Sequence, residues 1–84
     1  MEVEKEVIEL IANISKTPIE NISPRDRLAK DLGFDSLDVV ELTMDCEQQF
    51  QITVPEWESI RVDTVNDVIA VVSEHMEILR KIRK

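Results

Sequence analysis

Apolar residues recur at helical spacing near both ends of this 84-residue chain. Residues at positions i, i+3 or i+4, i+7 and i+8 fall on one face of an α-helix, so each set predicts an amphipathic helix. The sets are Val3, Val7, Leu10, Ile11 and Ile14 in the first part of the chain, and Val65, Val68, Ile69, Val72, Met76 and Leu79 in the last. The alternation typical of strands is confined to residues 52–54, which is too short to require a sheet. We therefore expect an all-α protein.

A further helix is predicted over residues 36–50, between two stretches that contain turn-forming residues. Asp35 can serve as its N-cap, and Asp38, three residues later, completes an approximate capping box. The first helix should stop before Pro18, because the residue that precedes a proline is pushed out of the helical region. The segment 15–35 combines turn formers with spaced apolar residues, so we expect a long loop that packs across the helices.

Two more helix starts lie in the second half of the chain. Pro55 suits the first position of a short helix over residues 55–60. Thr64 followed by Asp67 marks the start of the last helix. The prediction is a small four-helix bundle, with a short third helix and a long loop between helices 1 and 2.

The composition excludes several classes of protein. One cysteine, Cys46, rules out an internal disulfide and a Cys-rich zinc site. No apolar run approaches the roughly 18 residues needed to cross a bilayer, and the acidic N-terminal sequence does not resemble a signal peptide. A net charge of −8 opposes binding to nucleic acid or anionic lipid. We expect a monomeric cytoplasmic protein with one domain over residues 1–84, including a basic extension at about 80–84.

The negative charge is concentrated in the middle of the chain. Residues 31–60 carry eight acids and no Lys or Arg, whereas the segments on either side are nearly neutral. A solvated helix face is one explanation, but a stretch of one sign lacks the Glu–Lys pairs that stabilise exposed helices. The pattern favours a partner with a basic surface.

The predicted helix over residues 36–50 has two apolar stripes. At 100° per residue, one stripe is wide enough to face the core, and it consists of Val39, Leu42, Cys46 and Phe50. The second stripe is narrower and bordered by Glu41 and Glu47, and it consists of Leu37, Val40 and Met44. A small bundle that wraps this helix would bury both stripes. An acidic rim without bases favours an exposed docking surface instead.

The segment Asp31-Leu32-Gly33-Phe34-Asp35-Ser36-Leu37-Asp38 resembles the modification motif of acyl carrier proteins. The resemblance runs from the first helix to about Val72, and it includes residues 40–42, Met44, Phe50, Ile52, Val54-Pro55 and the start of the last helix at 64–67. It implies that Ser36 carries a 4′-phosphopantetheine arm, which a phosphopantetheinyl transferase takes from coenzyme A. The arm would hold an acyl group as a thioester for enzymes of fatty acid, lipid or related biosynthesis.

The residues near Ser36 support a role as a substrate rather than as a catalyst. The one histidine, His75, lies in the last predicted helix, so no general base is expected beside Ser36. We therefore expect no enzymatic activity. We also expect no metal site, because the nearby aspartates lack the spacing of a calcium loop. Cys46 falls in the core stripe and is interpreted as a small buried hydrophobe.

The resemblance also implies docking of basic enzyme surfaces on the helix that follows Ser36. The predicted docking residues are Asp35, Leu37, Asp38, Val40, Glu41, Met44 and Glu47. The expected partners are the transferase and the acyl-loading and acyl-transfer enzymes. Gln48 and Gln49 depart from the acids common in the family, and such departures suggest a specialised carrier. Two alternatives stay open: a peptidyl or aminoacyl carrier, and an unmodified acidic helical interaction module.

Overall fold

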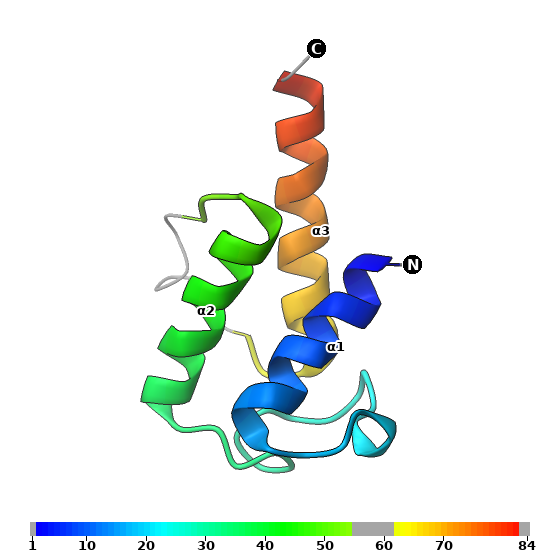
Figure 1. Ribbon diagram of the computed structural model, residues 1–84, viewed down its shortest axis with the longest axis vertical. Helices are drawn as coiled ribbons and strands as arrows, with labels where there is room; N and C mark the ends of the chain where they lie inside the picture. Colours follow the sequence, from blue (N-terminus) through cyan, green and yellow to red (C-terminus); the bar gives the residue numbers. More distant parts are fainter. Residues whose placement is uncertain (1, 55–61, 83–84) are drawn as a thin grey trace.

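The computed structural model describes residues 2–54 and 62–82. These residues form three α-helices and one short 3-10 helix: α1 (Glu2–Ser15), η1 (Ile19–Asn21), α2 (Ser36–Phe50) and α3 (Val65–Ile82) (Figure 1). In this part of the chain the only extended pairing is a single bridge between Arg27 and Thr64, so the all-α prediction is confirmed. The predicted short helix at 55–60 lies outside the described residues. The described residues therefore contain three α-helices and η1, and the short third helix of the predicted four-helix bundle is not among them.

The helix α1 is the centre of the packing. It packs more extensively against α2 and α3 than these two helices pack against each other. Its predicted stripe is buried at Val7 and Ile11, and the stripe of α3 is buried at Val65, Val68 and Val72. Both ends of the chain therefore fold as their apolar periodicity predicts, because burying these stripes removes apolar surface from water.

The helix α2 has the bounds that its sequence predicts. The Asp38 N–H donates to Asp35 Oδ1 over 2.9 Å, and the Asp35 N–H donates to Asp38 Oδ2 over 3.1 Å. This reciprocal capping box satisfies two backbone donors at the helix start. At the other end, Gln51 adopts a left-handed conformation with φ of 54° and closes the helix.

The connection between α1 and α2 packs against the start of α3, as predicted for residues 15–35. The Leu28 N–H donates to the Asp63 carbonyl over 2.8 Å, and the Val65 N–H donates to the Asp26 carbonyl over 3.0 Å. The Arg27 guanidinium forms an ion pair of 3.1 Å with the Asp63 carboxylate. The apolar residues of this connection enter the core, namely Ile22, Leu28 and Phe34. The long loop is thus tied down just before α2 begins.

Among the described helices, none is long and apolar enough to cross a membrane.

Candidate functional site

Ser36 is the first residue of α2, and its side chain is exposed. The chain before it is held in place: Phe34 is buried, and its N–H donates to the Leu28 carbonyl over 2.9 Å. Gly33 has a φ of +74°, a conformation that side chains other than glycine rarely adopt. The turn at Gly33 and the anchor at Phe34 therefore present the exposed Ser36 on a fixed support.

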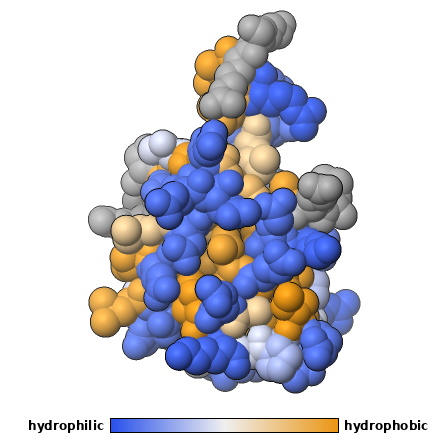
Figure 2. All heavy atoms as spheres, in the orientation of Figure 1, coloured by the Kyte–Doolittle hydropathy of each residue, from blue (hydrophilic) through white to orange (hydrophobic). Residues whose placement is uncertain are grey.

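The second apolar stripe of α2 is exposed. Leu37 is 76% exposed, Val40 53% and Met44 62%, whereas Leu42 and Cys46 on the core stripe are 1% and 0% exposed. In Figure 2, hydrophobic atoms reach the surface among hydrophilic ones on the α2 side of the molecule. The alternative in which the bundle buries both stripes is not what the described residues form. We refer to Leu37, Val40 and Met44 as the apolar strip.

The four predicted docking acids differ in their surroundings. Asp35 and Glu41 are exposed, and Asp38 is half-buried within the capping box. Glu47 is half-buried, and its Oε2 accepts a hydrogen bond of 2.8 Å from the Val54 N–H. Glu47 therefore holds the segment that follows α2, a role that sequence reasoning missed. The one available signal was that the predicted helix ends at residue 50, so the chain that follows can fold back toward the last turn of α2.

The remaining reactive side chains do not gather around Ser36. Burial, with a smaller effect of the adjacent carboxylates of Asp45 and Glu47, raises the pKa of the Cys46 thiol to about 12. This buried thiol is unreactive in the fold, as predicted. His75 lies on α3, where its Nδ1 is 2.9 Å from the Val71 carbonyl oxygen. Within residues 2–54 and 62–82, no three His, Cys, Asp or Glu side chains form a group that could hold a metal ion.

Comparison with known proteins identifies the family. The sequence model of a family described as "Phosphopantetheine attachment site" matches residues 5–72. A protein named "Acyl carrier protein" from Rickettsia bellii (strain RML369-C) is 41% identical over 73 residues, which cover 87% of this chain and 85% of the relative. This chain belongs to the acyl carrier protein family. Its cofactor is therefore 4′-phosphopantetheine, and it belongs to a family of carriers of acyl groups.

Other relatives support the same assignment. An "Acyl carrier protein" from Porphyromonas gingivalis (strain ATCC 33277) is 33% identical and covers 90% of this chain and 97% of its own length. Among solved structures, the "Solution structure of the apo doublet acyl carrier protein from prodigiosin biosynthesis" is similar, with a TM-score of 0.74 and 22% identity. The match covers 87% of this carrier and 35% of the doublet, and it supports the fold alone.

Proposed function

We propose that Ser36 is the residue to which the 4′-phosphopantetheine arm is attached. The observation that carries this proposal is the exposed side chain of Ser36 at the first position of α2, within the matched attachment domain. The first N–H groups of an α-helix have no acceptor within the helix, and the helix dipole favours an anion at that end. A phosphodiester on Ser36 would therefore lie in a favourable place.

The arm supplies a terminal thiol that holds an acyl group as a thioester, and the protein supplies the support. The anchored turn at Gly33 and Phe34 fixes the point of attachment. His75 lies on α3 close to the Val71 carbonyl, so it does not act as a base for Ser36. Ser36 is in this proposal a substrate of a phosphopantetheinyl transferase, which brings the catalytic groups.

The same proposal assigns partner docking to the surface of α2. Asp35, Asp38 and Glu41 steer basic enzyme surfaces, since charges of opposite sign accelerate the encounter. The apolar strip then provides contact area around Met44, whose unbranched side chain adapts to different partners. Glu47 contributes charge, but its bond to Val54 also makes it structural. The expected partners are acyl-loading and acyl-transfer enzymes of fatty acid, lipid or a specialised biosynthesis.

Mass spectrometry tests the attachment site. The full chain is incubated with coenzyme A and a phosphopantetheinyl transferase of broad specificity, and intact masses are recorded. Wild type should gain one arm and Ser36→Ala none. Ser73→Ala, which removes an exposed serine on α3, is the matched control and should be modified like wild type. An unmodified wild type, or a modified Ser36→Ala, would contradict the proposal.

Charge reversal tests the docking surface. Glu41→Lys should lower the rate of arm transfer about tenfold at low salt, because it reverses an exposed charge beside the apolar strip. Glu74→Lys reverses an exposed charge on α3 and should leave the rate within about twofold of wild type. The effect of Glu41→Lys on the rate, and any small effect of Glu74→Lys, should shrink as salt is added. Equal rates for the two variants at low salt would show that α2 does not guide the transferase.

A further inference from the structure

The C-terminal part of α3 extends beyond the residues that the family model matches. The family match ends at residue 72, whereas α3 continues to Ile82. Figure 1 shows its last turns extending beyond the ends of α1 and α2. Ile78 is 48% exposed and Ile82 is 73% exposed, so apolar surface remains in contact with water there. Figure 2 shows hydrophobic and hydrophilic atoms side by side at this end of the molecule.

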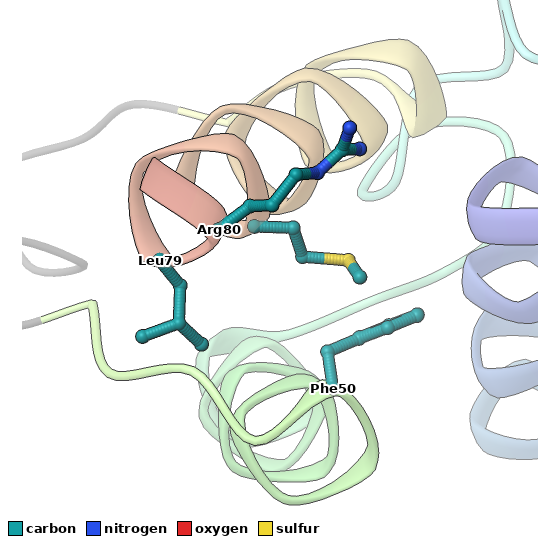
Figure 3. Close-up of a pocket in the computed structure, with 4 residues that line it drawn as sticks. Phe50, Leu79 and Arg80 are labelled. Atoms are coloured by element: carbon teal, nitrogen blue, oxygen red, sulfur yellow. The ribbon is translucent and has the colours of Figure 1, made fainter. Parts of the chain in front are cut away.

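Two hollows flank Leu79 in this region. The first has a volume of about 310 Å³ and is lined by Phe50 of α2 and by Met76, Leu79 and Arg80 of α3. In Figure 3, the side chains of Phe50 and Leu79 extend into the space between the two helices, and the Arg80 side chain runs along α3 at its edge. The second hollow, of about 220 Å³, lies between the residues after α2 and the stretch of α3 from His75 to Ile82. The first volume is at the lower end of the range for small-molecule sites.

The charge of this end is opposite to that of the rest of the chain. Residues 78–84 contain four of the ten bases and none of the 18 acids, so the other 77 residues carry six bases and all 18 acids. The side chain of Arg80 is 80% exposed, and its ion pair with Glu77 is 3.3 Å long. Exposed pairs of this kind contribute little, so Glu77 leaves the Arg80 guanidinium open to another anion.

We propose that the hollow between Phe50, Met76, Leu79 and Arg80 binds a single-chain anionic amphiphile as a free molecule. Its apolar chain would lie against Phe50 and Leu79, and its carboxylate or phosphate would meet Arg80 at the edge. Lys81, the next residue along the chain, adds a second positive charge to this part of α3. The long Arg80 side chain suits both parts, because its methylene groups line the apolar space and its guanidinium stays in water. A single molecule fits better than an anionic bilayer, because the 18 acids of the remaining chain repel a surface with many charges.

This site is separate from the proposed attachment site. Ser36 and Phe50 are the two ends of α2, and a rise of 1.5 Å per residue places their backbones about 21 Å apart. A molecule bound at the hollow would therefore leave Ser36 accessible. The two proposals fail independently, because the hollow can be tested in a chain that cannot receive the arm.

The test uses the full chain with Ser36→Ala and three probes kept below their micelle concentrations. Octanoate, octyl phosphate and octan-1-ol are titrated into 15N-labelled protein, and amide shifts are followed by NMR. Both anions should shift the amides of Phe50 and residues 76–81 in a saturable way, with about tenfold tighter binding than the alcohol. Equally tight binding of the alcohol, or anion-induced shifts confined to the Ser36 end of α2, would overturn the proposal.

Matched variants distinguish binding at the hollow from a general effect of the protein's charge. Arg80→Gln with Lys81→Gln should weaken both anions about tenfold, while Arg25→Gln with Lys30→Gln, an equal loss of charge in an exposed loop, should leave them unchanged. All four bases are exposed, so folding is expected to persist, and circular dichroism checks it. Equal behaviour of the two double variants would overturn the proposal. A membrane surface would be the ligand instead if the protein sedimented with phosphatidylcholine/phosphatidylglycerol vesicles but did not bind the free anions in a saturable way. That result would also overturn the proposal.

Discussion

The two faces of α2 contain similar residues in different surroundings. Leu42 and Cys46 on one face are almost completely buried, whereas Leu37 and Met44 on the other are mostly exposed. Exposing large apolar side chains has no benefit for folding, so the exposed face points to a function outside the fold. The apolar residues on each face of a helix therefore have to be considered separately before either set is assigned to the core.

The largest expected difference between the two faces is in thiol chemistry. The pKa of Cys46 is about 12, against an ordinary value of 9.0, so its thiolate is about a thousandfold scarcer at pH 8. A Met44→Cys variant therefore has one thiol on each face. With an aromatic disulfide reagent, we expect a fast phase from residue 44 and a phase slower by roughly three orders of magnitude from Cys46. Two phases with similar rates would mean that the core face opens readily.

Truncation of leucines gives the next largest difference. Leu42→Ala should lower the free energy of unfolding by about 3 kcal/mol, because it leaves a cavity in the core. Leu37→Ala should lower it by less than about 0.5 kcal/mol, since its side chain is already in water. Urea unfolding measures both. Leu42→Val, with an expected loss of about 1 kcal/mol, keeps the comparison measurable where the alanine variant is too unstable. Similar losses at positions 37 and 42 would remove the distinction between the faces.

The two acids that border the apolar strip, Glu41 and Glu47, should differ by a smaller amount in their effects on stability and on arm transfer. Glu47→Ala should cost about 1 kcal/mol of stability, because the Val54 N–H loses its acceptor. Glu41→Ala should leave stability nearly unchanged and should slow arm transfer more than Glu47→Ala does. Denaturant titrations and transfer rates on the same two proteins provide the measurement. The opposite order in both assays would assign the structural role to Glu41.

The smallest expected effect on stability comes from Asp67 in the first turn of α3. Because α3 is separate from α2, this effect serves as a reference for the two faces of α2. Hydrogen bonds from the backbone N–H groups of Thr64 and Asp63, together with the Thr64 side chain, lower the pKa of Asp67. A lowered pKa in the fold means that the ionised carboxylate stabilises the protein above the ordinary pKa of 3.8. This stabilisation is lost as the pH falls through the lowered value.

The stability difference between wild type and Asp67→Asn should therefore be full at pH 7 and should disappear well below pH 3.8. Urea unfolding at a series of pH values checks it, and Leu37→Ala serves as a control whose small difference should not depend on pH. A difference for Asp67→Asn that grows on acidification would contradict the assigned cause.

Local patterns predicted much of this structure. The bounds of α2, the capping residues at Asp35 and Thr64, and the division of α2 into two stripes follow from residues within one or two helical turns of each other. Periodicity and capping act over that range, so they can be recognised in a single sequence. The exposed position of Ser36 follows in the same way from its place at a helix start.

Contacts between distant residues could not be predicted. The ion pair of Arg27 with Asp63 joins residues 36 apart, and the bond from Gln49 to Glu6 joins residues 43 apart. Neither pair shares a helix, a period or a cap, so no local signal marks it. The same reason hid the hollow beside Leu79, which exists only because α2 and α3 meet at Phe50.

The backbone bonds between residues 24–28 and 63–66 also bear on the order of events during synthesis. A chain that leaves the ribosome from its N-terminus makes α1 and α2 before residues 63–66 exist. Residues 24–28, which precede the turn at Gly33, then lack the backbone hydrogen bonds to residues 63–66 that hold them in the finished protein. We therefore expect a transferase that recognises this fixed turn to act on completed chains, and not on nascent ones.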